Sequence, residues 1–215
     1  MHYTSVLFDL DGTLLDTLGD LTAAMNRTLT RHGLPERTRQ QMRAALGNGA
    51  RRLMELCAPE GIDSALFETL LAEYNADYAA HCRIETAPYP GVDALLRQLH
   101  AQGRKLAIVS NKPDEAVRAL RAEFFADTVP IAVGEKTGIR RKPAPDTLLA
   151  AMAQLGADPA STVYVGDSEV DIATARAAGL PCISVLWGFR DRDVLEQAGA
   201  QQFAADANEL ARLLD

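Results

Sequence analysis

The sequence contains few of the residues on which several classes of protein depend. Its three cysteines, Cys57, Cys82 and Cys182, lack metal-ligand spacing and cannot all pair within one chain, which favours a reducing cytoplasm over a disulfide framework. No apolar run approaches the ~18 residues needed to cross a bilayer, and no signal peptide fits before the first predicted strand. Basic residues are outnumbered 22 to 29, so the formal net charge of −7 argues against nucleic acid or an anionic membrane as partner.

Residues 6–16, Val-Leu-Phe-Asp-Leu-Asp-Gly-Thr-Leu-Leu-Asp, are the most informative segment. A short apolar run followed by Asp and Gly is typical of a buried parallel strand, so Asp9 and Asp11 are expected at its carboxyl end, where open α/β sheets bind ligands. Two carboxylates ~4 Å apart repel by ~4 kcal/mol at an effective dielectric of 20. Both carboxylates are ionised only if a cation lies between them, which suggests Mg²⁺. Otherwise they share one proton and form an acid and base pair.

Residues 17–86 are predicted to form an inserted, all-helical domain. Apolar residues recur at helical spacing through roughly four helices, and the breaks between them fall at residues 33–35, 47–49 and 59–61. We therefore expect a core domain of residues 1–16 and 87–215, interrupted by this insertion. With 215 residues, of which 47% are hydrophobic, the chain is long enough for such a core.

Helix and strand patterns alternate from residue 91 onward. Helices are predicted near residues 91–102, 114–124, 145–155 and 168–178; strands are predicted at residues 105–109, 128–133, 162–165 and 182–186, before a short strand and a final helix. This alternation predicts an α/β fold with a doubly wound parallel sheet. Because parallel strands direct their carboxyl ends to one edge, the residues that follow each strand are expected to converge.

Further polar residues follow the predicted strands or open a helix, and they are Ser110, Asn111, Lys142, Asp167 and Asp171. Ser110 can donate to a phosphoryl oxygen, Lys142 can neutralise that oxygen, and Asp167 can complete an oxygen-rich site for Mg²⁺. Hydroxyl, ammonium and carboxylate groups at one edge indicate phosphoryl transfer.

Several of these acidic and basic residues also fit structural roles. Residues 168–171, Ser-Glu-Val-Asp, match a helix capping box, so Asp171 is predicted as either a cap or a functional residue. Lys142 can equally be a solvated loop charge. Asp16 is predicted to cap the first inserted helix, with Asp20 adding a favourable charge near the helix N-terminus.

The chain resembles the haloacid dehalogenase superfamily of phosphohydrolases over its whole length. The four motifs of that superfamily match, in order, residues 9–13 (Asp-Leu-Asp-Gly-Thr), residues 110–111 (Ser-Asn), Lys142 and residues 166–171 (Gly-Asp-Ser-Glu-Val-Asp). The helical insertion looks like the helical cap domain of the superfamily. Residues 16–21, 46–49 and 110–112 are similar to those of phosphoglycolate phosphatases.

The resemblance implies a phosphomonoester hydrolase that works in two steps with Mg²⁺. Asp9 attacks phosphorus to form an aspartyl-phosphate, while Asp11 protonates the leaving oxygen and then activates water. The metal ligands implied are the Asp9 carboxylate, the Asp11 backbone carbonyl and the Asp167 carboxylate, with Asp171 in support. The residues implied to bind the phosphate are Thr13, Ser110, Asn111 and Lys142.

The substrate is expected to be a small phosphorylated metabolite, selected when the helical domain closes and excludes water. Asn48, between two glycines, offers amide donors, and Arg51 adds positive charge. Both suit a small carboxylate, so 2-phosphoglycolate is the substrate that we expect. A plain turn with solvated arginines fits the same residues.

Other phosphate substrates and other functions are also compatible with these motifs. Sugar phosphates, nucleotides and pyrophosphate are alternative substrates. A phosphosugar mutase is disfavoured because no His stands in the first turn of the insertion, near Leu18. A non-catalytic module that binds phosphorylated ligands is disfavoured by the intact pair of Asp9 and Asp11.

Overall fold

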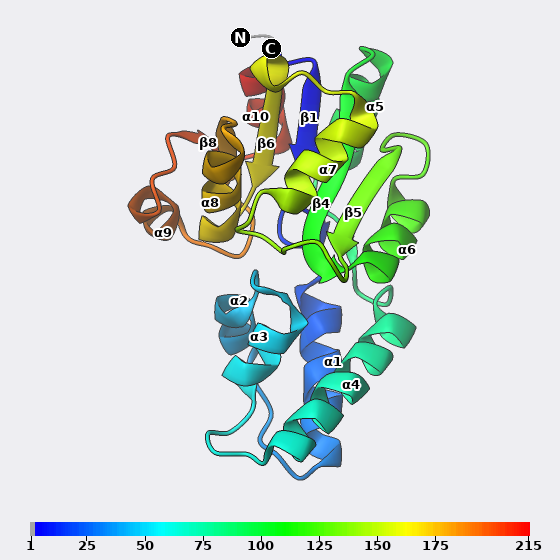
Figure 1. The fold of residues 1–215 in the computed structure, drawn as a ribbon, viewed down its shortest axis with the longest axis vertical. Helices are drawn as coiled ribbons and strands as arrows, with labels where there is room; N and C mark the ends of the chain where they lie inside the picture. The colour runs from blue at the N-terminus through cyan, green and yellow to red at the C-terminus, as the bar shows by residue number, and fades with distance from the viewer. Residues whose placement is uncertain (1–2) are drawn as a thin grey trace. The chain divides into compact units, whose positions relative to one another are not determined.

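The computed structural model describes residues 3–215, which form two compact units (Figure 1). The residues up to Asp16, together with Pro88–Asp215, make the first unit, here called the sheet unit. The residues Thr17–Ala87 make the second, here called the helical unit. The chain passes between the units through two short strands, β2 (Leu15–Asp16) and β3 (Ala87–Pro88), which pair with each other.

A six-stranded parallel sheet forms the centre of the sheet unit. Its order is β5-β4-β1-β6-β7-β8, and the strands are β1 (Ser5–Phe8), β4 (Lys105–Pro113), β5 (Ile131–Glu135), β6 (Thr162–Gly166), β7 (Cys182–Val185) and β8 (Gln202–Ala204). The chain moves away from β1 in one direction through β4 and β5 and in the other through β6, β7 and β8. Such a switch point is the usual ligand site of an open α/β sheet.

Helices cover both faces of this sheet. On one face, α5 (Val92–Ala101) contacts α10 (Ala207–Leu214); on the other, α7 (Asp146–Leu155) contacts α8 (Glu169–Ala178). Figure 1 shows α7 in front of the sheet and α10 behind it. The helix α6 (Asp114–Phe124) links β4 to β5, and the short α9 (Arg192–Gln197) links β7 to β8. The predicted α/β fold with a doubly wound parallel sheet is confirmed.

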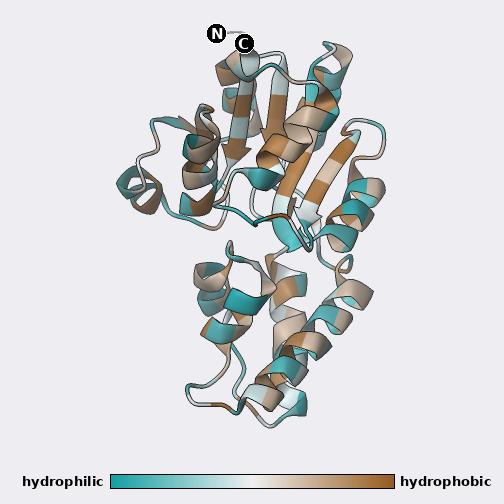
Figure 2. Ribbon diagram, in the orientation of Figure 1, coloured by the Kyte–Doolittle hydropathy of each residue, from teal (hydrophilic) through white to brown (hydrophobic). Residues whose placement is uncertain are grey.

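The central strands are buried, as their continuous apolar runs predicted. Residues 6–8 of β1 and residues 163–165 of β6 have no exposed surface. Covering both faces of a parallel sheet requires such runs, and each large apolar side chain buried contributes roughly 1.5–3 kcal/mol. Figure 2 shows hydrophobic strands whose pattern changes at the carboxyl end of β4, where the chain becomes hydrophilic. Polar side chains thus gather at one edge of an apolar core.

The helical unit consists of α1 (Leu18–Arg31), α2 (Arg39–Ala45), α3 (Gly49–Cys57) and α4 (Ser64–His81). The predicted breaks at residues 33–35, 47–49 and 59–61 fall at or beside the junctions between these helices. The helix α1 packs against α2 and α4, and α3 packs against the same two helices. Within residues 3–215, no helix combines the length and the hydropathy of a membrane span.

The structure corrects several local predictions. The strand expected at residues 128–133 is β5, which begins at Ile131, because the amides of Thr128 and Val129 still donate to the Phe125 carbonyl in the turn after α6. The N-cap of α1 is Thr17, whereas Asp16 lies in β2. The elements β2, β3 and α9 had no counterpart in the prediction.

Asp20 does more than place a charge in the first turn of α1. Its carboxylate accepts hydrogen bonds from the amides of Ile84, Glu85 and Thr86 at 3.0–3.1 Å and from the Thr86 hydroxyl at 2.8 Å. Asp20 is only 3% exposed, so these donors replace the water that the carboxylate loses. The contact ties the end of the helical unit to its beginning.

Asp77 joins α4 to α1. Its carboxylate, whose side chain is 2% exposed, accepts from Arg27 at 2.6 Å and from Arg31 at 3.1 Å. Burial raises the pKa of Asp77, but the hydrogen bonds and charge of Arg27, with His81 and Arg31, outweigh burial and hold the pKa below its usual value. The carboxylate therefore stabilises the folded state in its ionised form.

We predict that Asp77→Asn lowers the free energy of unfolding at pH 7 by about 1–2 kcal/mol, because both arginines are partly exposed and screened by water. Since the folded-state pKa is lowered, the contribution of the carboxylate is complete above the unfolded-state value of ~3.9 and is lost as the pH falls through the folded-state value. Urea unfolding at pH 7 and near pH ~3 should show the difference from the native protein shrinking in acid. Asp93→Asn, which breaks an exposed pair with Arg97, is the control. An Asp77→Asn effect independent of pH contradicts the ionic role.

Candidate functional site

Asp9 lies at the carboxyl end of β1, at the switch point of the sheet. The register pairs Phe8 with Ile108 on β4 and with Val165 on β6, so Asp9 comes level with the end of β6 at Gly166, whereas β4 continues to Pro113. Its backbone amide donates to the Val165 carbonyl at 2.8 Å, which extends the ladder by one residue. The Asp9 carboxylate is thereby held directly after a central strand whose residues 6–8 are fully buried.

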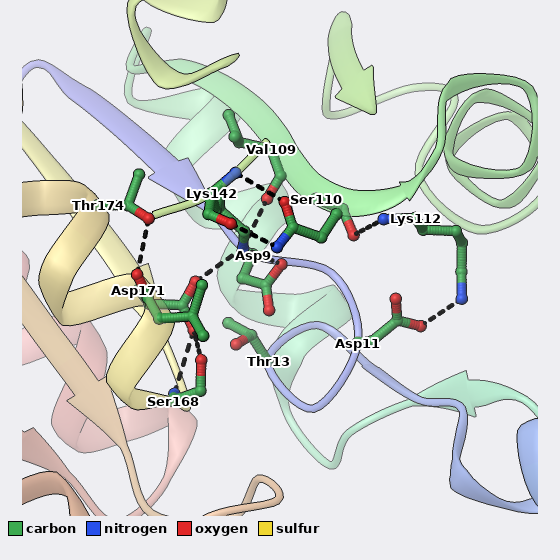
Figure 3. A network of polar contacts seen from close by, with 12 residues as sticks. Asp9, Asp11, Thr13, Val109, Ser110, Lys112, Lys142, Ser168, Asp171 and Thr174 are labelled. Carbon is green, nitrogen blue, oxygen red and sulfur yellow. Dashed lines mark hydrogen bonds and ion pairs between the residues drawn. The ribbon is translucent and has the colours of Figure 1, made fainter. Parts of the chain in front are cut away.

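Lys142 is the cation around which this edge is built (Figure 3). Its Nζ donates to Asp9 Oδ1 and Asp171 Oδ1, each at 2.7 Å, and to the Tyr164 hydroxyl oxygen at 2.9 Å. Burial alone lowers the pKa of Lys142, but the charges of Asp171 and Asp9 outweigh burial and hold the pKa above its usual value. Lys142, which is 3% exposed, is therefore a buried ammonium between two carboxylates and not a solvated charge.

Asn111 holds the backbone of Lys142. Its Nδ2 donates to the Lys142 carbonyl at 3.0 Å, and its Oδ1 accepts from the Lys142 amide at 2.8 Å. These two bonds connect the end of β4 to the loop before α7. The Asn111 side chain, predicted as a phosphate ligand, thus lies against the backbone that carries the ammonium.

Three carboxylates meet at this edge, and the structure brings Asp9, Asp167 and Asp171 together with one oxygen of each within 4.8 Å of the others. Phe189 N–H donates to Asp167 Oδ2 at 2.7 Å, and the Thr13 hydroxyl donates to Asp167 Oδ1 at 3.2 Å. Burial, followed by the charge of Asp171, raises the pKa of Asp167 to about 7. Burial likewise raises the pKa of Asp9 well above its usual value, against the opposing charge of Lys142.

The donor set of this cluster fits a divalent cation. Three buried carboxylates face the single ammonium of Lys142, so negative charge is in excess, and all the offered atoms are hard carboxylate oxygens. Mg²⁺ prefers such ligands and keeps several waters. A cation bound here would reverse the upward pKa shifts of Asp9 and Asp167, since both arise from burial and like charge.

Asp171 combines the two roles that its sequence position predicted as alternatives. Its Oδ2 accepts from the Ser168 amide at 3.1 Å and from the Ser168 hydroxyl at 2.6 Å, in the capping box of α8. Its Oδ1 faces Lys142. The helix start therefore orients one oxygen while the other belongs to the charge cluster.

Asp11 stands apart from the carboxylate cluster. Its Oδ1 accepts a hydrogen bond from Lys112 Nζ at 2.7 Å, and Figure 3 shows this pair on the other side of Asp9 from Asp171. Ser110 lies between the two groups, is 2% exposed and accepts from the Lys112 amide at 3.2 Å. The edge thus carries two buried lysines, one paired with Asp11 and the other with Asp9 and Asp171.

The loops around Asp167 leave no room for a side chain at two positions. Gly12 has a φ of +87°, and a Cβ there would lie 2.3 Å from Asp167 Oδ2. A Cβ at Gly188 would lie 2.3 Å from the Asp167 Cβ. Because both residues are glycines, the backbone can pass directly against this carboxylate. The two loops are also joined by a hydrogen bond from the Trp187 indole N–H to the Thr13 carbonyl at 3.0 Å.

Sequence reasoning missed Tyr164, Lys112 and the Phe189 amide. Tyr164 carried a usable signal, because a tyrosine in a buried strand needs a partner for its hydroxyl. Lys112 follows Ser110 and Asn111, which were predicted to bind phosphate, but no role was predicted for Lys112 itself. No signal marks the Phe189 amide, which lies 22 residues after the carboxylate that it contacts.

Asn48 and Arg51, predicted to bind substrate, belong to the helical unit. Asn48 occupies the N-cap position of α3, and its side chain makes no capping hydrogen bond. Arg51 donates to both oxygens of Glu68 on α4, at 2.8 and 2.9 Å, and lies over the Phe67 ring. The Arg51 side chain is half exposed, and its guanidinium is thus paired within the helical unit.

Comparison with known proteins gives consistent matches. A family model described as haloacid dehalogenase-like hydrolase matches residues 6–185. A phosphoglycolate phosphatase of Xanthomonas campestris pv. campestris is 36% identical over 187 residues, which cover 86% of this chain and 84% of that protein. An N-acetylmuramic acid 6-phosphate phosphatase of Pseudomonas aeruginosa is 33% identical over 100% of this chain and 96% of its own length.

Solved structures also match this chain over nearly its whole length. A crystal structure from Lactobacillus delbrueckii subsp. bulgaricus, provisionally assigned as a phosphoglycolate phosphatase, has a TM-score of 0.94 and 36% identity, and the match covers 100% of this chain and 99% of that one. A hydrolase from Pseudomonas syringae has a TM-score of 0.81 at 28% identity, over 99% of this chain and 98% of its own.

We predict that Gly188→Ala weakens binding of a divalent cation at least roughly tenfold, because the new methyl group displaces Asp167 from the cluster. Titration calorimetry with Mn²⁺ as the probe measures this change. Gly33→Ala is the control. Alanine at Gly33, whose φ is +66°, strains the backbone, but the added methyl group would meet no atom within 4 Å. Equal cation affinity of Gly188→Ala and the native protein contradicts a cation site at Asp167.

Proposed function

Since this chain belongs to the haloacid dehalogenase-like hydrolase family and is a phosphatase, we propose that it hydrolyses small phosphate monoesters with Mg²⁺ through an aspartyl-phosphate on Asp9. The observation that carries the proposal is the setting of Asp9 at the switch point of the sheet, 2.7 Å from the Lys142 ammonium and beside two more buried carboxylates. A nucleophilic carboxylate must be ionised and fixed in direction, and the lysine favours both.

Mg²⁺ is proposed to bind the Asp9 and Asp167 carboxylates and the Asp11 backbone carbonyl, with Asp171 in support. The excess of buried carboxylates over ammonium groups supports this ligand set. When bound, the metal neutralises charge as the carboxylate approaches a dianionic phosphate. Lys142 supplies a further fixed positive charge at the same place.

The proposed chemistry has two steps. An Asp9 carboxylate oxygen forms a bond to phosphorus, the bond to the ester oxygen breaks, and that oxygen takes the proton held by Asp11. Asp11 then accepts a proton from water as the water attacks phosphorus, which releases phosphate and restores Asp9. The hydroxyls of Thr13 and Ser110 are proposed to donate to phosphoryl oxygens, and Asn111 to position Lys142.

The substrate proposed is 2-phosphoglycolate. Several relatives at about 36% identity are named phosphoglycolate phosphatases, and the helical unit is proposed to act as a cap that chooses the leaving group. A phosphorylated sugar is the second candidate, because the N-acetylmuramic acid 6-phosphate phosphatase matches the full length of the chain.

We further propose that the protein works in the cytoplasm. Cys57, Cys82 and Cys182 are free thiols, which a reducing compartment maintains. Small phosphorylated metabolites are its proposed partners, and neither nucleic acid nor membrane is among them.

Asp9→Asn is predicted to reduce phosphatase activity by at least roughly 10³-fold, because the amide lacks the charge needed to attack phosphorus. Activity with Mg²⁺ is measured by phosphate release from 2-phosphoglycolate, N-acetylmuramic acid 6-phosphate, glucose 6-phosphate, a nucleoside monophosphate and pyrophosphate. Asp93→Asn, on the exposed face of α5, is the control. An active Asp9→Asn variant, or a native protein inactive on every ester, disproves the proposed function.

Arg51→Ala is predicted to raise KM for 2-phosphoglycolate more than KM for p-nitrophenyl phosphate, since only the first ester offers a carboxylate to the guanidinium. Steady-state kinetics on both esters tests this. Arg52→Ala is a matched comparison, because Arg52 follows on the same helix with a similarly exposed side chain and is paired with Glu55. Equal changes on both esters for Arg51→Ala remove Arg51 from the substrate site.

A further inference from the structure

Lys112 is a buried lysine for which the proposed two-step reaction has no use. The sequence contains 18 arginines but only four lysines, and two of these four, Lys112 and Lys142, are buried at the carboxyl edge of the sheet, 7% and 3% exposed. Buried lysines are rare unless they are paired. Lys142 is paired with Asp9 and Asp171, and Lys112 is paired with Asp11.

The two lysines serve opposite sides of the proposed reaction. Lys142 contacts Asp9, from which the bond to phosphorus forms. Lys112 contacts Asp11, from which the leaving oxygen takes its proton. A group that lies two bonds beyond the leaving oxygen can therefore reach Lys112 Nζ, because the ammonium and the leaving oxygen are hydrogen-bonded to the same carboxyl group.

We propose that Lys112 is a specificity-determining residue, whose ammonium binds a carboxylate on the leaving alcohol. The preferred substrates are then phosphate esters of small 2-hydroxy acids, in which the carboxylate is attached directly to the carbon that carries the ester, and not esters of neutral alcohols. This inference rests on the proposed function, because it places the leaving oxygen at Asp11. It names the substrate class of that same site.

The choice of lysine at this position fits the task. An ammonium has three donors on one atom, so Lys112 can bond Asp11 and a substrate carboxylate at the same time. Once Asp11 has given its proton to the leaving oxygen, the carboxylate of the leaving group would meet the like charge of Asp11 if this cation were absent. An arginine fork instead suits bidentate binding to a single carboxylate, as Arg51 shows with Glu68.

The inference also separates the two candidate substrates. In 2-phosphoglycolate the carboxylate is attached to the carbon that carries the phosphate ester. In N-acetylmuramic acid 6-phosphate the carboxylate belongs to a lactyl group on the far side of the sugar ring, many bonds from the ester oxygen. Lys112 therefore favours the first substrate.

The test compares 2-phosphoglycolate with 2-hydroxyethyl phosphate, in which CH₂OH replaces the carboxylate and the leaving group is still a primary alcohol. The native protein is expected to prefer 2-phosphoglycolate in kcat/KM. In Lys112→Met this preference is expected to fall at least roughly tenfold, mainly through a higher KM for 2-phosphoglycolate, and Lys112→Arg is expected to restore part of it. Lys136→Met, at an exposed lysine after β5, is the control.

A purely structural role of Lys112 would lower activity on both esters by the same factor, and this result overturns the inference. An unchanged preference in Lys112→Met overturns it as well. In either case the proposed function still stands if both activities are lost in Asp9→Asn. If the native protein hydrolyses neither of these two esters, the inference fails, and the proposed function fails with it only when the sugar phosphates and the nucleoside monophosphate are not hydrolysed either.

A measurement on the native protein keeps the inference testable even where Lys112→Met does not fold. Glycolate is expected to inhibit hydrolysis of p-nitrophenyl phosphate competitively, at concentrations at least roughly tenfold below those at which ethylene glycol does. Equal inhibition by the two alcohols contradicts recognition of the carboxylate.

Discussion

The buried contact of Lys142 with Asp9 and Asp171 is the interaction on which the rest of the site depends. Moving a charge out of water costs several kcal/mol, and this cost is offset only when opposite charges and hydrogen bonds surround the group. The ammonium meets that condition by facing two carboxylates and the Tyr164 hydroxyl at once. Its partners come from β1, β6 and α8, and Asn111 at the end of β4 holds its backbone, so these elements must be assembled before the charges are compensated.

A second constraint is the excess of carboxylate at the same edge. Lys142 cannot compensate Asp9, Asp167 and Asp171 together, and the pKa values of Asp9 and Asp167 are raised accordingly. Asp167 is held in place by the Phe189 amide, and the backbone passes so close to it at Gly12 and Gly188 that a Cβ at either glycine would clash with it. An edge with such an excess of buried carboxylates is suited to bind a divalent cation, which is the physical basis of the proposed phosphatase mechanism.

The two units are each tied together internally, by different means. In the helical unit, Asp20 accepts from the backbone at residues 84–86, and Asp77 pairs with arginines of α1. In the sheet unit, the apolar strands β1 and β6 carry the carboxylates at their ends. The proposed chemistry depends on the sheet unit alone, whereas the proposed choice of substrate depends on Lys112 in the sheet unit and on Arg51 in the helical unit.

The sequence by itself determined most of the helices and strands and the positions at which chemistry is possible. Apolar runs and their breaks predicted β1, the helical insertion and the parallel sheet, and the Asp9–Asp11 segment marked the functional edge, because strand and helix periods are local properties of the chain. Tertiary structure alone decided which polar groups meet. It placed the Asn111 side chain against the Lys142 backbone and made Asp171 both a helix cap and a partner of Lys142. It also paired Asp11 with a lysine 101 residues away. Contacts at such separations depend on how strands order and pack, and no local pattern encodes them.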